Sequence, residues 1–591
     1  MPLAALNRPT ARWVSPATAA DTVAGLQSAL GIGRLTAAIL ARRGFSDAAA
    51  AQEFLQPKLD ALHDPSLMCD LDRATQRILA AIRASEPILI YGDYDVDGTI
   101  SVVVLKKTIE ILGGRAEYHI PHRIQEGYGM RAEVVERAVE RGVRLVISVD
   151  TGIRSNHVVE HTKRLGIDVI VTDHHLPDGE LPPAFAVLNP NRPDCRYPNK
   201  HLCGAGVTFK LIQSLLMRGG LTPARRSALL DSFLKPVAVA TVADIVPLTG
   251  ENRVIVHRGL SGLRDVRNPG LESLLAVAGL DIGESPTAHQ VAFRIAPRIN
   301  AAGRMADASD VIELFLTSDR DRARVIAEQL DGLNRERQAT ENEVLQAILA
   351  KCDEGFADDV RALVFAEPGW HLGVLGIVAS RLVERFSRPV FVLSDAAHTN
   401  GDADCFSGSG RSIPGFHLLD AIETMPDLFT RFGGHSAAAG VTLRCDLVDD
   451  FRRRFGDVAA ARLTADDLRP RYEIDAEAAF QELTERSIRE VLSLGPFGFG
   501  NPSPILRAMG VEVAGPPKES SSGKQLTIGF RHDGRTLFLK AWDFAERGEI
   551  LRAGAKLDIL FQIEDDPSGR KRGYGSWCLR LKDAVLHGSA D

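Results

Sequence analysis

Short apolar runs alternate with amphipathic stretches in the first half of the chain. Residues 87–91, 145–149 and 168–172 are almost continuously hydrophobic, as is typical of strands that are buried on both faces of a parallel sheet. Stretches with helical spacing of apolar residues follow the first two runs, at 99–112 and 155–165. Strands that alternate with helices predict an α/β domain with a parallel sheet.

The second half of the chain shows three further patterns. Residues 319–356 are highly charged with leucine and isoleucine at helical spacing, which predicts a long connecting helix. A second α/β unit begins near Val364; within it we expect a helix over 374–386 and a Gly-rich loop over 407–411. After about residue 470, short alternating strands separated by turns predict a small β-barrel.

Composition narrows the class of protein only slightly. A hydrophobic content of 45% and a charged content of 25% are ordinary for a globular protein. The net charge of -7 does not favour nucleic acid, so a phosphate backbone would have to be held by local basic groups or by metal ions. Seven cysteines without a C-x-x-C pair indicate a reducing, cytoplasmic compartment, and charges interrupt the apolar run 235–248 before it could span a membrane.

Three aspartates follow the first apolar run at alternate positions, Asp93, Asp95 and Asp97. If the segment stays extended, their side chains point to one side, because strand side chains repeat with a period of two. Such carboxylates repel one another, and a bound divalent cation removes that penalty. The alternative is that they are turn and N-cap residues of a helix that starts near Thr99.

Four more side chains extend this pattern. Asp150 follows the second apolar run, His174 and His175 follow the third, and Asp244 lies within an apolar stretch where burial requires a partner. A helix cap, a surface histidine or a hydrogen-bonded buried acid would be the ordinary alternatives. Oxygen and nitrogen donors without thiolate favour Mn²⁺ or Mg²⁺, with two ions sharing one carboxylate, and hydrolysis of a phosphoryl bond as the reaction class.

Six motifs together resemble the DHH phosphoesterases, and within that family its single-strand-specific exonucleases. In chain order they are Gly92-Asp93-Tyr94-Asp95-Val96-Asp97-Gly98, Ser148-Val149-Asp150-Thr151-Gly152, Asp173-His174-His175, Ala243-Asp244-Ile245-Val246-Pro247-Leu248 and Asn300-Ala301-Ala302-Gly303-Arg304, followed by Gly433-Gly434-His435. The resemblance implies that Asp150 bridges two ions, that Asp93 is an extra ligand or an acid/base helper and that His175 supports the site. The implied metal ligands are Asp93, Asp95, Asp97, Asp150, His174 and Asp244.

The resemblance also implies substrate contacts. Ser409, Arg411 and Arg123 are assigned to a terminal 5′-phosphate, and Arg304 and His435 to neighbouring phosphates. Tyr128 is a candidate for stacking on a base. From the residues alone, Arg123 and Arg304 could instead be surface ion pairs, Gly433 and Gly434 a plain turn, and Tyr128 a packed aromatic.

The implied architecture has five parts. They are an N-terminal extension (1–75), a DHH catalytic domain with a parallel sheet (76–318), a connecting helix (319–356), a DHHA1-type substrate domain (357–465) and an OB-fold barrel for nucleic acid (466–591). The implied activity is metal-dependent hydrolysis of single-stranded DNA from the 5′ end with release of mononucleotides, in DNA repair and recombination. A single-strand-binding protein and a helicase are the expected partners of a monomeric enzyme.

Two alternatives to this activity stay open. One is a DHH phosphodiesterase that acts on short oligonucleotides or cyclic dinucleotides; the barrel argues against it. The other is a non-catalytic single-strand-binding scaffold; the complete set of acidic motifs argues against that.

Overall fold

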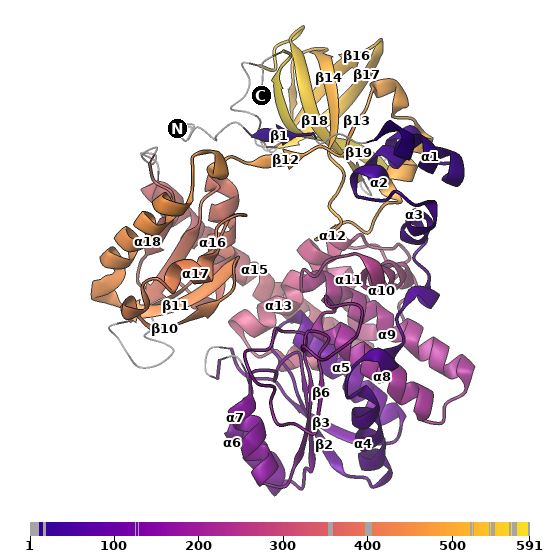
Figure 1. The fold of residues 1–591 in the computed structure, drawn as a ribbon, viewed down its shortest axis with the longest axis vertical. Coiled ribbons are helices and arrows are strands. Elements are labelled where there is room, and N and C mark those ends of the chain that lie inside the picture. Colours follow the sequence, from indigo (N-terminus) through magenta and orange to yellow (C-terminus); the bar gives the residue numbers. More distant parts are fainter. Residues whose placement is uncertain are drawn as a thin grey trace. The chain divides into compact units, whose positions relative to one another are not determined.

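The chain forms two compact units (Figure 1). The computed structural model describes residues 11–15, 19–123, 126–127, 129–352, 359–395, 405–520, 523, 525–542, 544, 550–566, 569 and 576–588. The first unit, here the parallel-sheet unit, comprises residues 56–337 and 495–502. The second, here the barrel unit, comprises the described residues before Gln56 together with 338–494 and those from Ser503 onward.

The parallel-sheet unit contains a five-stranded, fully parallel sheet. Its strand order is β3-β2-β4-β5-β6, for the strands β2 (Pro87–Tyr91), β3 (Arg115–His119), β4 (Leu145–Val149), β5 (Asp168–Thr172) and β6 (Ala186–Leu188). After β2 the chain continues to β3 on one side, and then returns to β4 on the other. The adjacent strands β2 and β4 therefore flank the topological switch point at which doubly wound α/β sheets bind their ligands.

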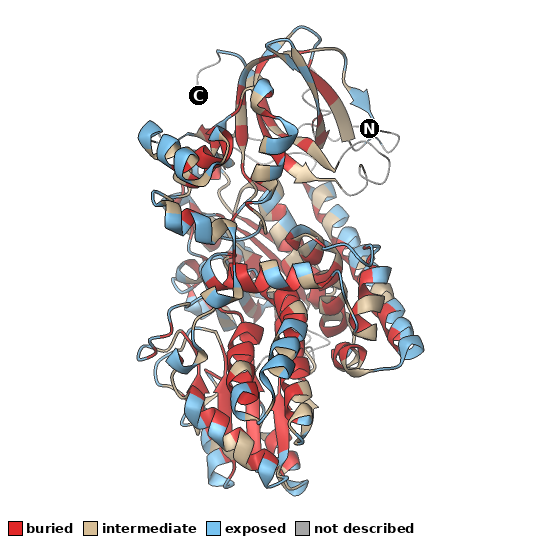
Figure 2. Ribbon diagram, turned by 90° about the vertical axis from the view of Figure 1, so that its right-hand side faces the viewer, coloured by how far each residue is buried: buried red, intermediate tan, exposed pale blue. Residues whose placement is uncertain are grey.

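Helices cover both faces of this sheet, which is why β2, β4 and β5 are almost continuously hydrophobic, whereas the edge strand β3 carries polar residues. Ile88 and Ile90 of β2 join a core with α4 (Leu71–Arg83), α5 (Val96–Ile111) and α8 (Gly204–Arg218). Leu89 and Tyr91 face the opposite way and pack with α6 (Ala132–Glu140), while β5 packs there with α7 (Asn156–Arg164). Figure 1 shows α6 and α7 on one side of the sheet and α4 and α8 on the other. Strands β2, β4, β5 and β6 are mostly buried (Figure 2), and the edge strand β3 is not.

Further helices complete this unit and lead out of it. They are α9 (Pro223–Ala243), α10 (Gly250–Gly262), α11 (Pro269–Val277), α13 (Ala296–Met305), α14 (Ser309–Leu316) and α15 (Arg320–Lys351). The predicted connecting helix is α15: Ile326 and Leu330 lie in the core of the parallel-sheet unit, and Val344 and Ile348 in a core of the barrel unit. Among the described helices, none is both long enough and apolar enough to cross a membrane.

The barrel unit contains a second α/β element, a mixed five-stranded sheet of order β10-β11-β9-β8-β7. Its strands are β7 (Leu363–Ala366), β8 (Val390–Asp395), β9 (Cys405–Arg411), β10 (Phe429–Gly434) and β11 (Ala438–Arg444). Helix α16 (Leu372–Phe386) connects the parallel pair β7 and β8, and α18 (Val448–Arg462) packs Phe451 and Phe455 against Phe391.

The prediction of a loop over residues 407–411 is wrong, because these residues form the greater part of strand β9. The glycines there allow close packing instead of a turn. A Cβ on Gly408 would lie 2.1 Å from the carbonyl oxygen of Val392, and a Cβ on Gly410 would lie 2.5 Å from the ring of Phe391. Glycine in a strand often marks such a close approach.

Five strands close into a barrel near the C-terminus, which agrees with the predicted OB fold. The pairings run β14-β18-β19-β17-β16 and return to β14, for β14 (Leu506–Val513), β16 (Gln525–His532), β17 (Arg535–Trp542), β18 (Lys556–Asp565) and β19 (Trp577–Leu586). Asp533 and Gly534 join β16 to β17 with φ angles of 47° and 79°, as a tight hairpin requires.

The N-terminal segment packs with the barrel. Strand β1 (Arg12–Val14) pairs with β12 (Arg471–Glu473), and the indole N–H of Trp13 donates to Asp583 at 2.8 Å. Helix α2 (Arg34–Arg42) contacts α19 (Glu485–Leu492), and the N–H of Gly33 donates to Glu490 at 2.7 Å. The described residues 11–15 and 19–55 thus belong structurally with the C-terminal part of the chain, although the predicted domain boundaries themselves stay a prediction.

Candidate metal centre

The carboxylates gather at the switch point of the parallel sheet. Asp93 lies two residues after β2, and Asp150 lies directly after β4, the neighbouring strand. Both side chains are buried. Because parallel strands end at the same edge of a sheet, two aspartates that are 57 positions apart in sequence meet in one place.

The segment after Asp93 does not stay extended as far as predicted. Asp95 is the N-cap of α5, and its Oδ1 accepts hydrogen bonds from the N–H groups of Asp97 at 2.9 Å and Gly98 at 3.0 Å. The helix therefore begins at Val96, three residues before the expected Thr99, because this capping pulls the chain into helical geometry at once. The N-cap alternative and the metal hypothesis are compatible, since Asp95 Oδ2 is not used for capping.

Asp97 is held by the N-terminus of another helix. Its carboxylate accepts hydrogen bonds from the N–H groups of Gly204 at 2.5 Å and Ala205 at 2.8 Å, both in the first turn of α8. The positive end of the helix dipole favours a negative charge in this position. The sequence reasoning missed this anchor, since no local pattern links residues that lie about a hundred positions apart.

Asp150 has a left-handed backbone with a φ of 59°, which aspartate tolerates better than most residues. Its N–H donates to the carbonyl of Thr172 at 2.9 Å, which ties the end of β4 to the end of β5. A Cβ on Gly204 would lie 2.6 Å from Asp150 Oδ1. The start of α8 thus leaves room for Asp150 only because residue 204 is glycine.

Asp173 orients the two histidines. Its Oδ1 accepts hydrogen bonds from the N–H groups of His174 at 2.7 Å and His175 at 3.1 Å, and lies 2.7 Å from His175 Nδ1. Burial by itself would raise the pKa of Asp173, but the hydrogen bond and charge of His175 outweigh it and lower this pKa to about 2. The side chains of Asn189 and Asn191 bind the carbonyls of His175 and His174. Asp173 was not among the predicted site residues, although its place after β5 was a signal for it.

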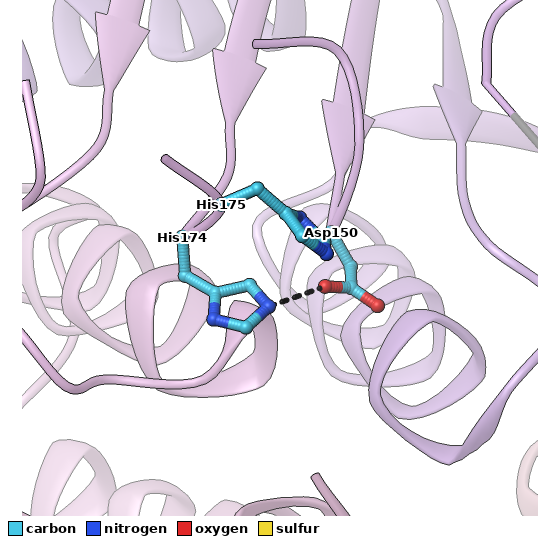
Figure 3. A group of neighbouring side chains, drawn as sticks. All are labelled: Asp150, His174 and His175. Atoms are coloured by element: carbon cyan, nitrogen blue, oxygen red, sulfur yellow. Dashed lines mark ion pairs between the residues drawn. The ribbon is translucent and has the colours of Figure 1, made fainter. Parts of the chain in front are cut away.

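His174 lies between the carboxylates of different elements. Its Nε2 is 3.2 Å from Asp150 Oδ1 (Figure 3) and 3.9 Å from Asp97 Oδ2, and its Nδ1 is 3.8 Å from Asp244 Oδ2. Asp244 is the C-cap of α9 and directly follows its last residue, Ala243. A carboxylate is unfavourable at a helix C-terminus, so this position calls for a compensating positive charge.

Three groups of donor atoms lie close enough to hold metal ions. They are Asp93, Asp95 and Asp150; Asp97, His174 and Asp244; and Asp150, His174 and His175, each with ligand atoms within 4.8 Å of one another. Asp150 belongs to two of these groups. The structure therefore brings together all six predicted metal ligands and His175.

The carboxylate oxygens themselves indicate that a cation fits here. Asp93 Oδ1, Asp150 Oδ1 and Asp244 Oδ2 are buried, and no residue in the described part of the chain gives them a hydrogen bond. Buried acceptors of this kind are normally satisfied. Six oxygen and nitrogen donors without a thiolate match the preferences of Mn²⁺ and Mg²⁺.

Burial and mutual repulsion shift the acid–base behaviour of the cluster. Burial, followed by the charge of Asp95, raises the pKa of Asp93 to about 8. Burial also raises the pKa values of Asp95, Asp150 and Asp244, with neighbouring carboxylates as the next cause. Burial lowers the pKa of His174. Without a cation, the cluster therefore keeps protons that ordinary aspartates lose.

Two predicted phosphate ligands lie beside the metal centre. The guanidinium of Arg123 lies 4.9 Å from the centroid of the Tyr94 ring. Arg304 lies near the end of α13, and its neighbour Gly303 is packed so closely that a Cβ there would lie 2.4 Å from the carbonyl oxygen of Tyr94. The charges of both arginines act on the phenol of Tyr94. Tyr128 lies outside the described residues.

The other predicted substrate residues belong to the barrel unit. Ser409 and Arg411 lie two positions apart on β9 and face the first turns of α16, since a Cβ on Gly376 would lie 2.9 Å from Arg411 Nη2 and 3.5 Å from Ser409 Cβ. His435 is exposed in the turn between β10 and β11, and its N–H donates to the carbonyl of Ala438, the residue paired with Arg411. The structure thus gathers these three residues in one lobe.

The sheet, the Asp-His-His turn and the carboxylate cluster define a protein of the DHH class. The model "DHH family, N-terminal domain" matches residues 87–241, and the model "DHHA1 domain" matches residues 359–461. The model "RecJ OB domain" matches residues 474–572.

Relatives narrow this class further. The chain is 36% identical to the single-stranded-DNA-specific exonuclease RecJ of Bacillus subtilis over 97% of this chain and 71% of that protein. It is 38% identical to RecJ of Escherichia coli over 74% of this chain and 77% of that protein. The crystal structure of Thermus thermophilus RecJ in complex with Mn²⁺ is similar with a TM-score of 0.81 and 29% identity, over 98% of this chain and 81% of that one. This chain belongs to the RecJ family, which confirms the resemblance and the predicted fold class.

The raised pKa values predict that metal binding releases protons. At pH 7 the metal-free protein retains a proton on Asp93, whose pKa is about 8, and a ligating carboxylate must lose it. Calorimetric titration with Mn²⁺ in two buffers of different ionisation enthalpy should show net proton release, which diminishes by pH 9. Identical binding enthalpies in the two buffers would contradict the account of the cluster.

Because the space at Gly204 is narrow, we expect a single added methyl group there to weaken metal binding. Gly204→Ala should displace the Asp150 carboxylate and weaken Mn²⁺ binding by roughly 10–100-fold, as is usual for groups that orient ligands. The fold should remain stable, since alanine favours a helix. Gly332→Ala on α15 is the matched control, because a Cβ there meets nothing within 4 Å. Equal Mn²⁺ affinity of the two variants in calorimetry would remove the proposed role of α8.

Proposed function

We propose that this chain is a metal-dependent exonuclease that hydrolyses single-stranded DNA. The observation that carries the proposal is the pair of donor groups that share Asp150 at the switch point of the sheet. Pairs of metal ions about 3.5–4 Å apart are common in enzymes that cleave phosphodiesters. The relatives named as single-stranded-DNA-specific exonucleases support the same substrate for this chain.

The cofactor we propose is a pair of Mn²⁺ or Mg²⁺ ions. Bound cations would supply Lewis-acid stabilisation of the negative charge that develops on the scissile phosphate. Asp150 is the proposed shared ligand. Asp97 is a further proposed ligand, and the N–H groups at the start of α8 orient its carboxylate. Asp93 either completes the ligand set or exchanges a proton with water at the site. Asp173 keeps His175 oriented from behind.

Positive groups next to the centre are the proposed contacts to the DNA backbone. Arg123 and Arg304 both lie near Tyr94, in the middle of the aspartate segment. Guanidinium groups match phosphate oxygens well because they offer two parallel N–H donors. In this way the unit that holds the cations also offers positive charge to the phosphates of the strand, despite the net charge of -7 of the whole chain.

The second α/β lobe is the proposed site for the 5′-terminal phosphate. Arg411 and Ser409 face the N-terminal turns of α16, a 15-residue helix. Helix N-termini bind anions through free N–H groups, and a guanidinium adds charge. Recognition of this end would set the direction of hydrolysis from 5′ to 3′, with release of mononucleotides. His435 is a proposed contact to a neighbouring phosphate in the same lobe.

The barrel is the proposed site that retains the rest of the strand. OB folds bind single strands by combining basic side chains with aromatic rings on which bases stack. Phe538 on β17 is 64% exposed, and Arg580 on β19 lies over the ring of Trp542 at 5.0 Å. We also propose that the enzyme is a monomer and acts in DNA repair and recombination, together with a single-strand-binding protein and a helicase.

Substitution of the shared ligand should separate catalysis from binding. Asp150→Ala should abolish cleavage of end-labelled single-stranded DNA, because both donor groups lose a member, while binding of the strand survives. Asp178→Ala, in an exposed loop of the same unit, is the control. Wild-type nuclease activity of Asp150→Ala, or an inactive wild-type enzyme with both cations supplied, would overturn the proposal.

Removal of Arg411 should act mainly on the end of the strand. Arg411→Ala should lower kcat/KM on 5′-phosphorylated strands by roughly 10–100-fold, the range expected from a lost charge-assisted hydrogen bond. Its effect on 5′-hydroxyl strands should be much smaller. Arg431→Ala, on the exposed part of β10, is the control. Equal losses on both strands would contradict recognition of the terminal phosphate.

A further inference from the structure

Two large apolar side chains are exposed on the segment that follows the proposed ligand Asp244 and on a turn that is bonded to this segment. Ile245 is 69% exposed and directly follows Asp244, one of the proposed ligands. Phe499 is 60% exposed and belongs to residues 495–502, the short segment that joins the parallel-sheet unit from far along the chain. Neither side chain contributes much to a hydrophobic core, so packing does not explain why these two positions are apolar.

The backbone of Ile245 is strained. Helix α9 ends with Asp244 as its C-cap, and Ile245 then adopts a φ of 57°. Glycine or asparagine usually occupies this position of a helix end, because a β-branched side chain is disfavoured there by its contact with the backbone. A strained residue that exposes its side chain beside a site indicates a function for that side chain.

Phe499 is presented by a rigid turn. Gly498 and Asn501 exchange both backbone hydrogen bonds, at 2.9 and 3.1 Å, which leaves Phe499 and Gly500 as a two-residue loop. Gly500 has the φ of 73° that such a loop needs. The buried side chain of Asn501 donates to the carbonyl of Pro496 at 2.8 Å and fixes the loop from inside.

This turn is docked on the chain that follows Asp244. The N–H of Leu248 donates to the carbonyl of Phe499 at 2.7 Å. A Cβ on Gly500 would lie 2.8 Å from Pro247 Cβ and 3.0 Å from Pro247 Cα, so the turn packs directly against Pro247. The turn is held through its backbone, and the Phe499 ring is left available.

Ile245 and the turn that carries Phe499 are therefore linked through the short segment that follows Asp244. Ile245 and Leu248 are three residues apart, which is at most about 11 Å even in a fully extended chain. The other groups of the centre are charged or polar and suit phosphates and cations. An apolar surface at this position suits the other part of a nucleotide, its base, since stacking on apolar and aromatic side chains tolerates any sequence.

We propose that Ile245 and Phe499 form an apolar contact for a nucleobase of the strand whose phosphate is cleaved at the metal centre. This inference rests on the proposed function and names two side chains that select the substrate. Bases that are paired and stacked in a duplex cannot offer their faces without being unstacked, whereas an unpaired base offers its face freely. The contact thus contributes to the preference for single strands.

The test compares Ile245→Gly and Phe499→Ala with the wild-type enzyme on two substrates. One is an ordinary single strand, and the other carries a short abasic tract at the end that is cut first. On the ordinary strand, each variant should raise KM by roughly 5- to 100-fold, the range that loss of a stacking contact gives. On the abasic strand, wild type and variants should have the same KM. Phe499→Tyr, which keeps the ring, should behave as wild type.

Two further measurements exclude a merely structural role. Ile245→Gly relieves the strained backbone, so its Tm should equal or exceed that of the wild type, and Mn²⁺ affinity should be unchanged in both variants. Wild-type KM values of the variants on the ordinary strand, equal losses on both strands or a lower Tm of Ile245→Gly would each overturn the inference. If the wild type does not cleave, the proposed function fails. The base contact is then tested by equilibrium binding: fluorescence anisotropy measures the affinity of the wild type and the variants for the same two strands. A loss of affinity for the ordinary strand alone would support the contact, and equal affinities or equal losses would overturn it.

Discussion

The repulsion between buried carboxylates is the constraint around which the parallel-sheet unit is organised. Asp93 and Asp150 end neighbouring strands, and Asp95, Asp97 and Asp244 approach them from helices. Like charges buried so close together destabilise a fold unless protons or cations compensate them. The protein partly compensates with the N-terminus of α8 at Asp97, and the unsatisfied oxygens leave the rest to bound cations.

Several features that lie far apart in the sequence position the side chains of this carboxylate cluster. Gly98 and Gly204 leave room where a Cβ would collide with Asp93 or Asp150. Asp173 accepts a hydrogen bond from the N–H of Ile153, after β4, and its other carboxylate oxygen contacts the N–H groups of His174 and His175 and the ring of His175, which fixes the direction of both histidines. The strained turn at Ile245 positions Asp244 at the end of a helix and, in our proposal, places an apolar side chain where the substrate arrives. Backbone strain and close packing are thus found around the proposed metal centre.

Sequence patterns predicted the strands that carry the site well. Runs at 87–91, 145–149 and 168–172 coincide with β2, β4 and β5, because strands that are buried on both faces must be apolar throughout. The meeting of Asp93 and Asp150 then followed from topology. The patterns could not predict that Gly204 and Ala205 anchor Asp97, since that contact depends on long-range packing. They also misread β9 as a loop, because glycine marks close packing there as well as turns.

In our proposal, the carboxylate of Asp150 is shared by two divalent cations. The most direct measurement is a crystal structure of the protein grown with Mn²⁺, with anomalous scattering recorded at the manganese edge. We expect two anomalous peaks about 3.5–4 Å apart, with the Asp150 carboxylate in contact with both. A single peak, or two peaks of which only one touches Asp150, would contradict it.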